Sequence, residues 1–213
     1  MSESPEASGQ GPAKPKKGFL TWALWGVALV GVAAVLYIIG QASSNQPQVA
    51  STPPAASVPK FSAKFVKPAE PRTPPDHVFY DAKGKAMTIA DLKGKVVVMN
   101  IWATWCAPCQ AEMPTLAKLQ AHYKGQPVEV VAVSIDSVDD AAKATLFIAK
   151  NEPLKFYHDR EMKMPFVLKP VAPGAPTTVI YGKDGMEVGR VAGEADWSGA
   201  DVRAVIDQAL AAG

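Results

Sequence analysis

The segment Lys95–Ala103, KVVVMNIWA, is a continuous run of apolar and β-branched residues. Such a run is typical of a β-strand buried on both faces, because a strand with one face in water alternates apolar and polar residues. A second run of this type, VEVVAVSID, occupies Val128–Asp136. Strands of this kind need helices above and below their sheet. The sequence therefore favours an α/β sandwich around a central sheet.

Two hairpins and several helices complete the predicted domain. Residues 77–89 indicate two strands joined around Lys83-Gly84, and residues 177–193 indicate two more around Lys183-Asp184-Gly185. A short strand is expected in LKFYHD and a short helix in REMKMPFVLK. Apolar residues at helical spacing predict longer helices over about 107–123, 138–150 and 198–211. Parallel and antiparallel strands together make one mixed sheet.

The run Phe19–Ile39 contains no charged residue. At about 1.5 Å rise per residue, a helix over this run spans roughly the 30 Å of a bilayer core. Three lysines precede it, at positions 14, 16 and 17, and no charge follows it until Lys60. The bias of positive charge towards the cytoplasm predicts a cytoplasmic N-terminus and a domain across the membrane. A cleavable signal peptide is the main alternative, but its apolar region runs only about 7–15 residues, so we expect an uncleaved anchor.

Composition divides the chain into four predicted regions. Residues 1–18 are too polar to build a core and are expected to be a disordered cytoplasmic tail. Residues 19–40 form the predicted anchor. Residues 41–75 are rich in Pro, Ala and Ser, which favours an extended tether. Residues 76–213 form the predicted compact domain, which is long enough to bury a core without disulfides or metals.

The only two cysteines, Cys106 and Cys109, lie in WCAPC. A structural zinc site needs four ligands, and none of the three histidines lies at ligand spacing, so we expect no metal site. A disulfide across two intervening residues restricts the unfolded chain little, so a purely structural staple is disfavoured. A copper clasp made by the two thiolates stays open as an alternative.

The position of the pair suits electron transfer. Cys106 lies where a helix follows a buried strand, and the partial positive charge of a helix N-terminus stabilises a thiolate. Cys109, one turn further, is the natural resolving thiol. Pro108 is tolerated in the first helical turn. Pro114 lies deeper, removes a backbone hydrogen bond and is expected to kink the helix.

The segments VVVMNIWATWCAPCQAEMPTL and GAPTTVIYGKDGMEVGRVAG resemble the TlpA-like family of membrane-anchored thioredoxin-fold reductases, which includes cytochrome c maturation thioredoxins. The resemblance extends from Asp76 to the C-terminus. It implies a thioredoxin fold, a mixed central sheet flanked by helices, and it assigns residues 138–171 to the extra insertion of this branch.

The resemblance also implies roles for individual residues. Cys106 matches the exposed nucleophile and Cys109 the resolving thiol, while Trp105 matches the substrate-binding surface. Pro176 matches a cis-proline against the disulfide, and its backbone, with that of Ala175, would pair with an extended client segment. An ordinary proline at the start of a strand is the alternative for Pro176.

Glu112 lies three residues past Cys109, on nearly the same helical face. The resemblance assigns such a glutamate to proton exchange with the cysteines; a solvated surface glutamate is the alternative. Cytoplasmic thioredoxins carry a buried aspartate six residues before the first cysteine, where this chain has Asn100. Asparagine cannot titrate, which favours Glu112 as the proton acceptor.

The family implies a periplasm-facing protein-disulfide reductase that needs no organic cofactor or metal. Its implied clients are copper-centre assembly factors, cytochrome oxidase subunits or apocytochromes c, and a membrane electron-relay protein would reduce it again. An oxidase or isomerase of the same fold is an alternative, because sequence does not set the redox poise. A copper-binding chaperone is another. The net charge is only +2 and no basic stretch is interleaved with aromatic residues, so nucleic acid is not an expected partner.

Overall fold

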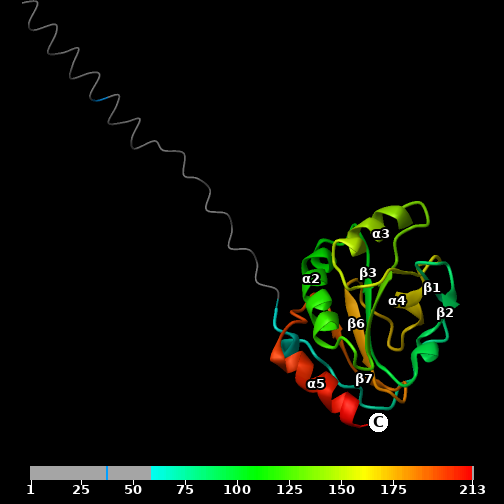
Figure 1. Ribbon diagram of the computed structural model, residues 1–213, viewed down its shortest axis with the longest axis vertical. Coiled ribbons are helices and arrows are strands. Elements are labelled where there is room, and N and C mark those ends of the chain that lie inside the picture. The colour runs from blue at the N-terminus through cyan, green and yellow to red at the C-terminus, as the bar shows by residue number, and fades with distance from the viewer. Residues whose placement is uncertain (1–36, 38–58, 213) are drawn as a thin grey trace, which may run out of the picture. The chain divides into compact units, whose positions relative to one another are not determined.

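The computed structural model describes Tyr37 and residues 59–212 (Figure 1). The predicted tail and tether up to residue 58, and the predicted anchor except Tyr37, lie outside the described residues. Among Tyr37 and residues 59–212, no helix is long and apolar enough to cross a membrane. Ser57–Gly213 forms one compact unit, and the description below concerns this unit.

A seven-stranded mixed sheet runs through the unit in the order β2-β1-β5-β4-β3-β6-β7. β3 lies near its centre, parallel to β4 and antiparallel to β6. Every residue of β3 and β4 is buried, as their continuous apolar runs predicted. The strands are β1 (Phe79–Asp81), β2 (Ala86–Met87), β3 (Val96–Trp102), β4 (Val128–Ser134), β5 (Tyr157–His158), β6 (Thr177–Tyr181) and β7 (Glu187–Ala192).

The helices lie close to the predicted positions. They are α2 (Ala107–His122), α3 (Ala141–Ala149), α4 (Met164–Val167) and α5 (Ala200–Ala211), with 3-10 turns η1 (Phe61–Ala63) and η2 (Ile89–Leu92). The C-terminal end of α2 lies near α5 (Figure 1), and the hydroxyl of Tyr123, the residue after α2, donates to the Asp207 carboxylate at 2.7 Å. Pro114 lies inside α2, which continues to His122; the kink expected there stays a prediction.

Residues 59–66, which we call the strap, lie against the domain rather than in a tether. Phe61 is 1% exposed, and its ring meets that of Trp197 edge-on with 5.3 Å between centroids. Val66 exchanges two backbone hydrogen bonds with Arg190, each 2.9 Å. Further along, the Arg72 carbonyl accepts a hydrogen bond from the Glu187 N–H at 2.8 Å.

The predicted domain boundary at residue 76 is therefore wrong, since the compact unit begins at Ser57. Proline removes backbone donors, but it does not prevent a chain from packing along a surface. The aromatic residues that anchor the strap, Phe61 and Phe65, are separated by Ser62, Ala63 and Lys64 and stand in no longer apolar pattern. They form no strand or long helix, so periodicity gave no indication of them.

A chain that begins at Asp76 is expected to be less stable than one that begins at Ser57 by about 3 kcal/mol, because losing a buried Phe side chain leaves a cavity. Urea unfolding of the two truncated proteins measures the difference. The chain from Ser57 serves as the control and should unfold in one cooperative transition. Equal unfolding free energies would show that the strap does not belong to the folded unit.

Candidate active site

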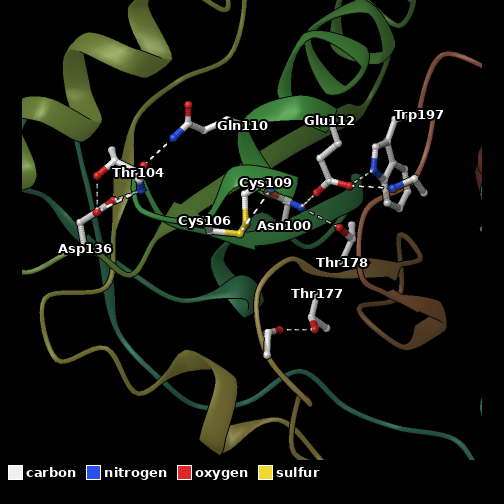
Figure 2. The surroundings of a disulfide bond; sticks show 12 residues. Asn100, Thr104, Cys106, Cys109, Gln110, Glu112, Asp136, Thr177, Thr178 and Trp197 are labelled. Atoms are coloured by element: carbon white, nitrogen blue, oxygen red, sulfur yellow. Dashed lines mark hydrogen bonds between the residues drawn. A yellow bond between two sulfur atoms is a disulfide. The ribbon is translucent and has the colours of Figure 1, made fainter. Parts of the chain in front are cut away.

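The cysteine pair lies where β3 passes into α2. Cys106 is the N-cap residue of α2, and its Sγ accepts a hydrogen bond from the Cys109 N–H at 3.3 Å. The two cysteines form a disulfide (Figure 2). Pro108 lies in the first helical turn, as predicted. A thiolate at position 106 would therefore meet both a backbone donor and the positive end of the helix.

The two cysteines differ in exposure. Cys106 is 6% exposed and Cys109 is 0% exposed, while the neighbouring Trp105 is 66% exposed. An attacking sulfur can therefore approach the pair from the Cys106 side. The exposed indole of Trp105 offers an apolar surface next to that approach.

Asp136, which the sequence analysis did not single out, fixes the loop before the cysteines. It is 0% exposed, and both carboxylate oxygens lie 3.0 Å from the Thr104 N–H (Figure 2). The hydroxyls of Thr104 and Ser134 donate to the same carboxylate at 2.7 and 2.8 Å. On the other side, the Gln110 side-chain amide donates to the Thr104 carbonyl. The loop is thus held from β4 and from α2.

Glu112 lies on the buried face of α2 and is 0% exposed. Its carboxylate accepts three hydrogen bonds: from Asn100 Nδ2 at 2.7 Å, from the Ala195 N–H at 2.9 Å and from Trp197 Nε1 at 3.1 Å (Figure 2). The solvated surface glutamate considered above is wrong for this residue. The carboxylate shares one face of α2 with Cys109 because the two are three residues apart.

Burial raises the pKa of Glu112 from 4.5 to about 7, although its three hydrogen-bond donors act in the opposite direction. The charge of Glu194 adds to the increase. All three neighbours donate, so the pocket suits the ionised carboxylate despite its burial. A carboxyl group balanced in this way can take up or release a proton near neutral pH.

Asn100 links Glu112 to the strand that follows the proline loop. Its Nδ2 donates to Glu112 and also to the Thr178 hydroxyl on β6 at 2.8 Å. Of Asn100, Thr178 and Glu112, only Glu112 can gain or lose a proton near neutral pH. This agrees with the expectation drawn from Asn100, which cannot titrate. The role of Glu112 in proton exchange stays a prediction.

The Ala175-Pro176 peptide bond is cis, as the resemblance implied. Pro176 directly precedes β6, whose residue Thr177 pairs with Ile101 of β3. This register places Ala175 and Pro176 at the end of the sheet where α2 begins. The pairing of this segment with a client stays a prediction.

Two of the histidines weighed as ligands are engaged elsewhere. His158 Nε2 lies 2.9 Å from the Asp136 carbonyl oxygen, and His77 Nε2 lies 2.9 Å from an Asp159 carboxylate oxygen. Within the described part of the chain, no group of three or more His, Cys, Asp or Glu side chains is placed to hold a metal ion.

A family model described as Redoxin matches residues 54–202, a range that includes the strap. The thiol-disulfide oxidoreductase ResA of Bacillus cereus is 35% identical over 120 residues, which cover 56% of this chain and 68% of the relative. In the same genus, the thioredoxin-like protein YneN of Bacillus subtilis is 38% identical over 96 residues, covering 45% of this chain and 56% of the relative.

Solved structures agree with the predicted fold. A protein described as the thiol:disulfide interchange protein DsbE from Chlorobium tepidum aligns with a TM-score of 0.56 and 26% identity, covering 65% of this chain and 95% of that one. A protein described as a thioredoxin from Neisseria meningitidis aligns with a TM-score of 0.54 and 28% identity, covering 65% and 89% of the two chains. The thioredoxin-like α/β fold is confirmed.

Proposed function

This chain belongs to the Redoxin family and is a thiol-disulfide oxidoreductase, and we propose that it works as a reductant of disulfides in client proteins. The observation that carries the proposal is the asymmetry of the cysteine pair. Cys106 caps a helix and keeps some exposed surface, whereas Cys109 is fully buried on the same helical face as the buried Glu112. One sulfur is placed to attack, and the other to finish the exchange.

The proposed reaction has two exchange steps. The Cys106 thiolate attacks one sulfur of the client disulfide, forms a mixed disulfide and releases the other client sulfur as a thiolate. Cys109 then loses its proton to the Glu112 carboxylate and attacks Cys106 Sγ. This step forms the Cys106–Cys109 disulfide and releases the second client sulfur, so two electrons have passed to the client.

We place this reaction at the periplasmic face of the cytoplasmic membrane, with residues 19–40 as a single-pass anchor and the N-terminus in the cytoplasm. The charge-free run and the preceding lysines support this arrangement. The clients proposed from the TlpA-like resemblance are copper-centre assembly factors, cytochrome oxidase subunits or apocytochromes c. The cycle needs no organic cofactor or metal, and a membrane electron-relay protein returns the electrons.

A Cys109→Ser variant tests the proposal in the native membrane. It can attack a client but cannot resolve the mixed disulfide, so clients should accumulate covalently attached to Cys106. Non-reducing gels followed by mass spectrometry identify the attached proteins and the linked cysteine. The matched control carries both Cys106→Ser and Cys109→Ser and should capture nothing. An empty trap while the reducing donor is supplied would contradict a client-reducing function.

A further inference from the structure

We propose that Phe61 of the strap is a positioning residue for Glu112, because it holds the Trp197 indole in place to donate to the Glu112 carboxylate. The Phe61 ring meets the Trp197 ring, which donates to the carboxylate, so Phe61 acts through Trp197. The functional consequence rests on the proposed role of Glu112 in proton exchange. The structural coupling itself can be measured separately.

Most of the hydrogen-bond donors around Glu112 come from one segment. Two of the three, the Ala195 N–H and Trp197 Nε1, come from residues 193–199, the segment between β7 and α5. We call this segment the donor loop. Its geometry therefore decides how well the charge of the buried carboxylate is stabilised.

Thr115 holds the donor loop on the side of α2. The Trp197 N–H donates to Thr115 Oγ1 at 3.0 Å, and the Thr115 hydroxyl donates to the Glu112 carbonyl at 2.7 Å. Thr115 thus fixes the backbone of Trp197. These two bonds do not fix the indole ring, whose direction depends on its packing.

The strap also contacts the donor loop. The Asp196 N–H donates to the Pro59 carbonyl at 2.8 Å, and Lys64 Nζ donates to the Glu194 carbonyl at 2.8 Å. Between these two bonds, the Phe61 ring meets the Trp197 ring edge-on at 5.3 Å. Both rings are almost fully buried, at 1% and 0% exposure. The strap therefore supports both the backbone of the donor loop and the indole.

Few charged groups lie near the Glu112 carboxylate that could compensate for a weaker hydrogen bond from Trp197. Asn100 on β3 and Thr178 on β6 are neutral, and on α2 the neighbouring groups are Thr115 and the cysteine pair. The donor loop carries Glu194, whose charge raises the pKa of Glu112, and Asp196, whose carboxylate accepts hydrogen bonds from the N–H and hydroxyl of Ser198. The strap carries Lys60, whose backbone bridges to Asp196, and Lys64, whose ammonium group donates to the Glu194 backbone carbonyl. A weaker indole bond should thus appear directly as a higher pKa of Glu112.

The size of the expected effect follows from the geometry of hydrogen bonds. The bond from Trp197 Nε1 to the Glu112 carboxylate is 3.1 Å long, near the upper end of the ordinary range, so a small ring rotation weakens it strongly. A hydrogen bond to a charged acceptor is worth enough to move a pKa by about one unit.

The experiment titrates Glu112 in the oxidised full chain, with 13C in the glutamate side-chain carboxyls and NMR as the readout. The Glu112 signal is assigned by its absence in Glu112→Gln. Phe61→Leu is expected to raise the pKa of Glu112 by about one unit. Phe61→Met, which also keeps much of the volume, replaces it if the leucine variant does not fold. Trp197→Phe should raise the pKa at least as much, since it removes the donor.

Two comparisons make the test specific. In the Trp197→Phe background, Phe61→Leu should not shift the pKa of Glu112 further, because the indole through which Phe61 acts is absent. Phe79→Leu is the matched control: Phe79 is 0% exposed and packs edge-on against Tyr157 at 5.7 Å, away from the donor loop. It should lower stability without moving the pKa of Glu112.

The proposal is overturned if Phe61→Leu and Phe61→Met leave the pKa of Glu112 unchanged, or if the shift persists fully without the Trp197 indole. A different pair of results would contradict the proposed role of Glu112 in proton exchange. In that case the pKa shifts as expected, but Glu112→Gln resolves mixed disulfides at the wild-type rate.

Discussion

Glu112→Gln is expected to slow resolution of the mixed disulfide about a hundredfold at pH 7, because it removes the base that accepts the Cys109 proton. Formation of the mixed disulfide by Cys106 should change much less. Rapid mixing of the reduced protein with a peptide disulfide, followed by acid quenching, separates the two steps. Equal resolution rates in the variant and the wild type would contradict the assigned role.

The same variant should change how stability depends on pH. The folded chain binds the Glu112 proton more tightly than the unfolded chain, since burial raises the pKa from 4.5 to about 7. The resulting stabilisation is fully present below pH 4.5 and is lost as pH rises through 7, which amounts to about 3 kcal/mol. Urea unfolding of the oxidised protein should show this loss in the wild type and not in Glu112→Gln.

Glu152→Gln is the matched control, because Glu152 is an exposed glutamate. It should leave both the resolution rate and the pH profile of stability unchanged. A wild-type stability that stays flat between pH 4.5 and 7 would contradict the raised pKa of Glu112.

Asp136→Ala is expected to destabilise the oxidised protein by about 4 kcal/mol, because it leaves several buried donors without an acceptor, each costing about 1–3 kcal/mol. These donors are the N–H and hydroxyl of Thr104 and the hydroxyl of Ser134. Asp136→Asn keeps one side-chain oxygen as an acceptor and should lose roughly half as much. Urea unfolding measures both losses.

The control for this prediction is Asp139→Ala, three residues away on the exposed surface. It should change the free energy of unfolding by less than about 0.5 kcal/mol. If Asp136→Ala is as mild as this control, the carboxylate does not hold the loop before the cysteines.

The elements of this fold could be predicted because their patterns are local. The apolar runs of β3 and β4, the two hairpins and the cysteines before α2 each depend on neighbouring residues. The strap escaped prediction because it is anchored by isolated aromatic residues, chiefly by the buried Phe61. Its partner, Trp197, is far away in the sequence, and no local period reports such a contact.

The residues of the active site also divide into those that local sequence patterns relate and those that only folding brings together. The two cysteines and Glu112 stand close together in the sequence, so helical spacing related them. Asp136, Ala195 and Trp197 reach the site only through folding. Asp136 lies two residues past the end of the apolar strand β4, whose last residue, Ser134, pairs with Trp102 at the end of β3. A polar residue just past the end of a buried strand is the feature that could have identified it.

The proposed function requires Cys106 to be an ionised nucleophile at neutral pH, while the buried Cys109 reacts only later, to resolve the mixed disulfide. The most direct test follows alkylation of the reduced protein by iodoacetamide against pH, with mass spectrometry to separate the two sites. We expect Cys106 to react first and to titrate at least about one unit below the 8.5 of a free cysteine. A Cys106 that titrates like free cysteine, or that reacts no faster than Cys109, would contradict the account.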